Sequence, residues 1–190
     1  MKTQFTKEYI SKNKGCYTDS AVEKIPFNKN KEVSLKELFD YLPIRDFNWW
    51  LCKKCELTDE QLQVFAVENA RYVLPIYEKQ YPNDSTVREC VEYTSDFIDG
   101  EGDIDTLIKK RAAANAVATS IYNTDGIGAM NYVVAAIAAD NAAACAFSHD
   151  SGAVYLSYHT SRAVVDIATT PIAYEEMVRE FVFQKLLNKK

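Results

Sequence analysis

The sequence predicts an all-α fold: an antiparallel helical bundle of tandem helix hairpins whose C-terminal half is rich in alanine. Six glycines and five prolines in 190 residues leave little material for the many tight turns of an all-β protein. Helix-start signals recur along the N-terminal half, and no apolar/polar alternation is long enough to predict a strand. Alanine, the strongest helix former, occurs seventeen times in residues 112–168 and three times in residues 1–111.

A chain of this length fits one domain with a sizeable core. We predict a single helical domain over residues 1–190, in three parts. Residues 1–33 form an N-terminal helical extension, and residues 34–111 form hairpins around a kinked helix. Residues 112–190 form the alanine-rich helices and a C-terminal helix.

Three capping boxes mark helix starts in the N-terminal half. In such a box, a Ser or Thr side chain and a Glu or Gln three residues later satisfy backbone donors that the helix leaves unpaired. The pairs are Ser20 with Glu23, Ser34 with Glu37, and Thr58 with Gln61. Pro43 ends the second of these helices at Leu42, because the residue before a proline disfavours the helical conformation.

The longest predicted helix of this half spans about residues 59–80, where apolar side chains recur at i, i+3, i+4 and i+7. Pro75 lies inside it and predicts a kink. Pro82 follows its end, and a new helix is predicted over residues 85–98. We expect opposite charges on the two helices to pair across this hairpin and to fix its register. These charges are Arg71 and Glu78 on the first helix, and Arg88 and Glu92 on the second.

Three more helices are predicted in the alanine-rich half, over residues 111–123, 131–147 and 153–168. Small side chains let helix axes approach closely, so this part of the bundle should be tightly packed. Thr170 followed by Pro171 predicts the N-terminus of the final helix.

Charge and hydropathy exclude several functions. The net charge of −5 and the pI near 5.2 argue against a nucleic-acid partner, because such proteins usually carry a basic face. The N-terminus has no apolar signal region, and the longest apolar stretch, residues 132–139, is far too short to span a membrane. We therefore expect a cytoplasmic protein without a membrane partner.

Five cysteines, an odd number, fit a reduced compartment. Cys52 and Cys55 have the spacing of a redox pair or of half a zinc site, but no second such pair occurs in the sequence. We favour two thiols packed near Trp49 and Trp50, and no bound metal or cofactor.

An acidic segment, residues 96–105, carries five acids: Asp96, Asp99, Glu101, Asp103 and Asp105. A calcium-binding EF-hand loop that starts at Asp99 would need glycine at its sixth position and glutamate at its twelfth, where Ile104 and Lys110 stand. We therefore expect a helix–helix loop in which Asp103 caps the next helix. All five acids, Asp103 included, are candidates for contact with a basic protein partner.

A second candidate contact consists of Tyr158, His159 and Arg162. His159, Arg162 and Asp166 share one helix face by their spacing, with Tyr155 and Tyr158 nearby. Catalysis by a general base here would need a nucleophile or a metal in a cleft, and the sequence shows neither. We expect these side chains to form a buried polar network between the alanine-rich helices.

Several stretches together resemble one family. "FTKEYISKNKGC", "DFNWWL" and "NARYVLPIYEKQYPNDSTVRECVEY" occur in this order before the alanine-rich tail. They resemble the putative immunity proteins of polymorphic toxin systems and related uncharacterised helical proteins of phages and bacteria. The family-like positions are Arg71, Val73, Leu74, Pro75, Tyr77, Glu78, Tyr81, Pro82, Asp84, Arg88, Glu92, Phe97, Gly100 and Glu101. The chain departs from the pattern at Asn69, where cysteine is usual, and keeps only one of two arginines near residue 88.

The resemblance implies an all-α, non-catalytic protein that neutralises a toxin by binding it. Two alternatives stay open: a phage-encoded inhibitor of a host defence enzyme, and an enzyme with a helical site near His159 and Arg162. A symmetric homodimer through the alanine-rich helices is also compatible with the sequence.

Overall fold

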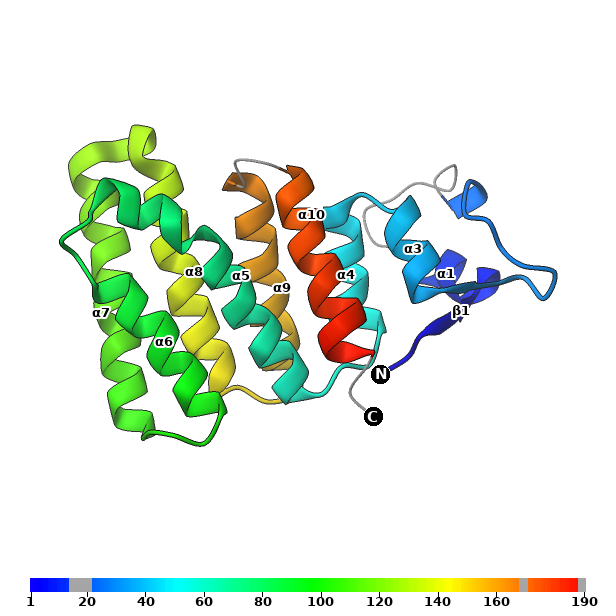
Figure 1. The fold of residues 1–190 in the computed structure, drawn as a ribbon, viewed down its shortest axis with the longest axis horizontal. Coiled ribbons are helices and arrows are strands. Elements are labelled where there is room, and N and C mark those ends of the chain that lie inside the picture. The colour runs from blue at the N-terminus through cyan, green and yellow to red at the C-terminus, as the bar shows by residue number, and fades with distance from the viewer. Residues whose placement is uncertain (14–21, 168–170, 188–190) are drawn as a thin grey trace. The chain divides into compact units, whose positions relative to one another are not determined.

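The computed structural model describes residues 1–13, 22–167 and 171–187. The chain forms two compact units (Figure 1). The terminal unit combines Met1–Thr58 with Glu175–Lys190, and the central unit is Asp59–Tyr174. The all-α prediction is confirmed, because helices dominate both units and the described strands form one two-stranded sheet.

The terminal unit starts with this small sheet. Strand β1 (Gln4–Thr6) pairs antiparallel with β2 (Glu32–Ser34), so that Phe5 lies opposite Val33 and both are buried. Helix α1 (Lys7–Lys12) follows β1 directly. The segment predicted as a helical extension, residues 1–33, therefore contains a strand as well as a short helix.

Helices α3 (Leu35–Tyr41) and α4 (Ile44–Lys54) complete the N-terminal part of this unit. The predicted capping box is confirmed: Ser34 accepts from the backbone of Glu37, whose carboxylate accepts from the backbone of Ser34. Helix α3 ends before Pro43, as predicted. The predicted helix starts at Ser20 and at Thr170 lie outside the described residues.

The core of the terminal unit is aromatic. The rings of Phe5 and Trp50 meet edge to face with centroids 5.2 Å apart, and those of Phe39 and Phe47 do so at 4.7 Å. The C-terminal segment also packs here: helix α10 (Pro171–Glu180) continues into a π-helix, η2 (Phe181–Leu186), and Phe183 packs edge to face on Phe39 at 5.8 Å. Residues far apart in the sequence thus share one core.

The central unit contains the long helices of the protein. Helices α5 (Asp59–Gln80) and α6 (Thr86–Ile98) form the predicted hairpin, and Figure 1 shows α5 bending partway along its length. Helix α7 (Ile104–Asp125) leads through the 3-10 turn η1 (Gly126–Ala129) into α8 (Met130–Ala146), and α9 (Ser151–Ile167) follows.

Helix α8 lies at the centre of this unit and packs against α5, α6, α7 and α9 (Figure 1). Every alanine of α8 is buried, and so is Cys145. Alanine side chains leave room for several neighbours at short distance, which is why a central helix has this composition.

The stretch Ile104–Ala146 is long and apolar enough to cross a membrane by composition, but 67% of its most apolar window is buried inside the protein. The buried core helix of a soluble protein has the same signature.

Candidate functional site

The α5–α6 hairpin carries most of the family-like residues, and its predicted charge pairs are confirmed. Arg71 Nη2 lies 3.3 Å from Glu92 Oε2, and Arg88 Nη2 lies 2.5 Å from Glu78 Oε1. Both pairs join α5 to α6. They therefore hold the hairpin in register, as the sequence suggested.

The turn between the two helices is held by a buried tyrosine. The Tyr77 hydroxyl donates to Asp84 Oδ2 at 2.7 Å, and Asp84 Oδ1 accepts from the backbone N–H of Thr86 at 2.9 Å. Burial raises the pKa of Asp84, but hydrogen bonds from Thr86 and Tyr77 outweigh this effect, so the pKa lies below its usual range. Burial, followed by the bond to Asp84, raises the pKa of Tyr77. An ionised carboxylate and a neutral phenol therefore persist at neutral pH and stabilise the turn.

The acidic segment links α6 to α7, and all five of its acids are exposed. Asp103 caps α7, as predicted: its Oδ1 accepts from the Thr106 N–H and its Oδ2 from the Thr106 hydroxyl, both at 2.8 Å. These bonds lower the pKa of Asp103. The Asp103 N–H donates to the Tyr93 hydroxyl at 2.9 Å, which ties the loop to α6. Asp96, Asp99, Glu101 and Asp105 face solvent around this fixed cap.

The acids of this segment do not form a metal site. No group of three or more potential metal ligands occurs among the residues that the structure describes. The acidic segment is a capped loop with exposed carboxylates.

The expectation that His159, Arg162 and Asp166 form a buried polar network on α9 is wrong. Arg162 and Asp166 are exposed, whereas Tyr158 and His159 are half-buried. The buried polar side chains of α9 are Ser157, Thr160 and Ser161. The spacing correctly places Arg162 and Asp166 on one face of α9, but that face is turned toward solvent. The small polar residues Ser157, Thr160 and Ser161 lie on the core side instead.

His159 lies among aromatic rings. Its ring centroid is 4.1 Å from that of Tyr155 and 5.3 Å from that of Tyr158. This aromatic group lies on α9, whereas the acidic segment runs from the end of α6 to the start of α7. The predicted contact residues therefore form two surfaces, one at the α6–α7 loop and one on α9.

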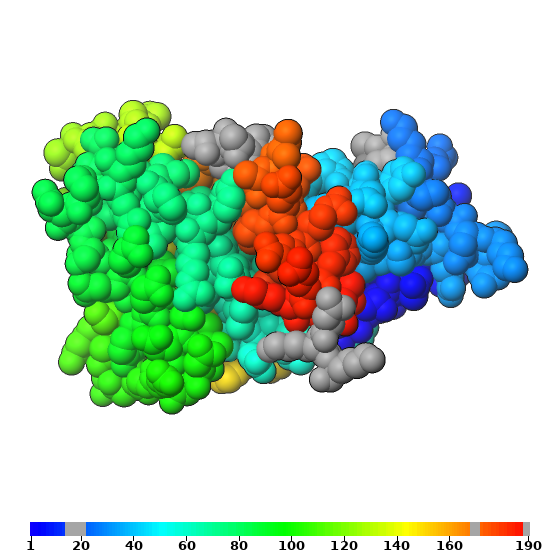
Figure 2. Space-filling model, in the orientation of Figure 1, coloured from blue at the N-terminus to red at the C-terminus, as the bar shows by residue number. Residues whose placement is uncertain are grey.

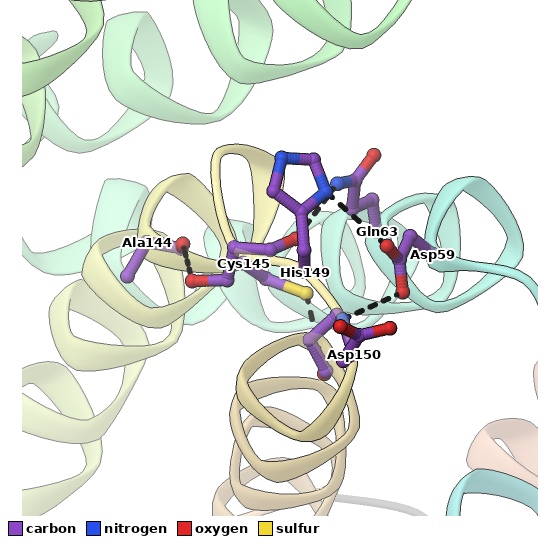
Figure 3. A network of polar contacts seen from close by, with 8 residues as sticks. Asp59, Gln63, Ala144, Cys145, His149 and Asp150 are labelled. Carbon is purple, nitrogen blue, oxygen red and sulfur yellow. Dashed lines mark hydrogen bonds and ion pairs between the residues drawn. The ribbon is translucent and has the colours of Figure 1, made fainter.

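A third polar cluster, which sequence reasoning missed, ties the α8–α9 loop to the start of α5 (Figure 3). Asp59 Oδ2 lies 3.2 Å from His149 Nδ1, and Asp59 Oδ1 accepts from the backbone N–H of Asp150 at 3.1 Å. Gln63 Nε2 donates to the backbone carbonyl of Ser148 at 3.3 Å. The sequence offered a weak hint of this cluster: Asp59 stands in the first turn of a predicted helix, and His149 is one of only two histidines. It gave no sign that the two residues meet.

A buried carboxylate joins the alanine-rich helices. Asp140 on α8 accepts from Arg111 Nε at 2.7 Å and from Asn115 Nδ2 at 3.2 Å, and both partners belong to α7. Asp140 is 8% exposed. This pairing compensates the charge of the one acidic side chain inside α8.

The four described cysteines are all buried, as expected for Cys52 and Cys55, whereas Cys16 lies outside the described residues. Burial raises the pKa of Cys55, and it raises the pKa of Cys90 to about 12. The thiolate form, which attacks substrates or binds metals, is therefore scarce at Cys55 and Cys90 at neutral pH.

Comparison with known proteins gives one match. No curated protein and no solved structure matches this chain. A family model, the Imm-5 like putative immunity protein, matches residues 54–165. This range contains α5 to α8 in full and nearly all of α9, so it covers most of the central unit. It also contains the charge-paired hairpin and the acidic segment described above. The chain belongs to the Imm-5 like putative immunity protein family.

Proposed function

We propose that the protein neutralises a protein toxin by binding it, without catalysing a reaction. The observation that carries this proposal is the family match over residues 54–165, which spans the helical scaffold of the central unit. The proposed place of action is the cytoplasm, where a toxin's producer would need protection.

The chemistry of the charged side chains supports binding. The ion pairs Arg71–Glu92 and Arg88–Glu78 act within the chain, and Asp140 is neutralised by α7. Such pairs rigidify a scaffold, and a rigid scaffold loses little conformational freedom when it binds. We assign the contact with the partner to side chains that project from the scaffold.

The acidic segment is the first proposed contact surface. Asp99 and Glu101 present exposed carboxylates on the loop, whose backbone is fixed by the Asp103 cap and by Tyr93. Asp96 at the end of α6 and Asp105 at the start of α7 add two more exposed carboxylates beside it. Exposed charges of one sign accelerate encounter with a partner of opposite charge. The matching partner is a basic toxin. Tyr158, His159 and Arg162 form the second proposed contact surface, in which aromatic and arginine side chains supply apolar and hydrogen-bonding contacts.

The test is co-expression with the toxin encoded by the neighbouring gene. Cells should survive only when this chain is present, and the two proteins should co-purify in a fixed ratio. A triple variant, Asp99→Asn, Glu101→Gln and Asp105→Asn, should slow association. The control Glu23→Gln with Glu56→Gln, which neutralises exposed acids of the terminal unit, should not. Protection without a complex would favour an enzyme instead. A partner that is a host defence enzyme would favour an inhibitor.

A further inference from the structure

A groove of about 560 Å³ lies on the terminal unit, outside the region that the family model matches. It is lined by Lys36 of α3 and by side chains of α10 and η2 from Glu176 to Leu187. Figure 2 shows this C-terminal segment, in red, on the viewed face beside α3, in light blue. The volume falls in the range of a ligand-binding cleft.

The lining combines apolar surface with unpaired acids. Phe183 is half-buried and Leu187 is 37% exposed, so both offer carbon surface to an occupant. Glu176 and Glu180 are exposed, and neither has an ion-pair partner among the residues that the structure describes.

The cations beside the groove only partly balance these acids. Arg179 also lines the groove, but its guanidinium pairs with Asp40 at 2.8 Å and lies 4.5 Å from the ring centroid of Phe39. Its charge is therefore neutralised within the chain. Lys36 remains as one ammonium group against the carboxylates of Glu176 and Glu180, so the groove favours a cationic occupant.

The spacing of the lining residues indicates the shape of that occupant. Glu176, Glu180, Phe183 and Leu187 follow one another at intervals of four, three and four residues, so they form a stripe along the segment. An amphipathic helix laid beside it presents apolar side chains to the carbon surface and Lys or Arg to the acids.

The backbone supplies an independent sign of function. Phe183 and Gln184 belong to η2, a π-helix of six residues. π-helical turns are rare and are frequently found at functional sites. Here the wider turn lies on the wall of the groove.

We propose that this groove docks a basic amphipathic helix of the toxin that the protein neutralises. The inference rests on the proposed function and adds to it a binding surface on the terminal unit. The central unit then supplies the scaffold shared across the family, and the terminal unit supplies a contact particular to this partner.

The probe is a catalytically inactive form of the neighbour-encoded toxin, titrated against the full chain by calorimetry. The double charge reversal Glu176→Lys with Glu180→Lys should weaken binding at least about ten-fold and should flatten its salt dependence. The matched control, Glu23→Lys with Glu56→Lys, makes the same change in net charge on the same unit and should bind like wild type. Leu187→Ser should weaken binding a few-fold without changing the salt dependence.

If the groove variant, the control variant and wild type all bind the toxin with equal affinity, the proposed role of the groove is refuted, while the proposed function stands. A wild-type protein that fails to bind the toxin would overturn both. A groove variant that changes the protein's own oligomeric state, measured by light scattering, would assign the groove to a second copy and refute the proposal. Circular dichroism verifies folding, and Glu176→Gln with Glu180→Gln replaces the reversal if that variant unfolds.

Discussion

Exchanging the two charges of the Arg88–Glu78 pair separates a structural role from a binding role. The pair joins the hairpin helices at 2.5 Å, with side-chain exposures of 53% for Arg88 and 25% for Glu78. Because the arginine is mostly in solvent, the pair should contribute about 0.5 to 1 kcal/mol rather than the larger value of a buried pair. Arg88→Glu also introduces a repulsion of similar size. We expect the single reversal to cost about 1 to 2 kcal/mol, which lowers the Tm by about 4 to 8 °C for a unit of this length.

The double variant Arg88→Glu with Glu78→Arg should regain most of the lost stability, because the two side chains again carry opposite charges, now in exchanged positions. Chemical denaturation of wild type, both single variants and the double variant gives the coupling energy directly. Lys79→Glu is the control, because Lys79 is exposed on the same hairpin without an ion pair to another described residue, and it should change stability by less than about 0.5 kcal/mol. In cells, the double variant should protect against the toxin as well as wild type does.

A coupling energy near zero would refute the structural role of this pair. A double variant that is stable but no longer protects would show that Arg88 or Glu78 contacts the partner.

Three further predictions concern the central unit. Replacing Asp140 with Ala should lower the free energy of unfolding by about 2 kcal/mol in urea denaturation, because a buried charge-assisted pair to α7 is lost; an unchanged midpoint would contradict this. Gly102→Ala should destabilise by about 1 to 3 kcal/mol, since φ is +130° and an added Cβ would lie 2.7 Å from the Tyr93 hydroxyl, whereas the control Gly128→Ala, which has open space around it, should not. The lowered pKa of Asp103 means that its carboxylate stabilises the fold above its unfolded pKa of about 3.9, and this stabilisation is lost as pH falls through the folded pKa. Asp103→Asn should therefore reduce the loss of stability between pH 5 and about pH 3, and an acid transition identical to wild type would argue against the cap.

Local chemistry accounts for what the sequence predicted well. The box at Ser34, the cap at Asp103 and the helix over residues 59–80 each depend on residues within one or two helical turns. The cross-hairpin pairs were accessible for the same reason, because a short turn brings the ends of two predicted helices side by side.

The missing features depend on distant segments. Strands β1 and β2 have three residues each, so neither shows an alternation that a sequence pattern could reveal. They pair although α1 and residues 13–31 separate them in the sequence. The packing of Phe183 on Phe39 joins the two ends of the chain, and no local signal predicts such a contact. The orientation of α9 also depended on tertiary packing, because Ser157 and Ser161, rather than Arg162, fill the core side.

The most direct test of the proposed immunity function is size-exclusion chromatography with light scattering on this chain mixed with an inactive form of a candidate toxin encoded beside its gene. We predict one complex of fixed stoichiometry that forms at low salt and weakens at high salt. Variants that lose this complex should also lose protection in cells. Two separate peaks at micromolar concentrations, from a folded protein that nevertheless protects cells, would contradict neutralisation by binding.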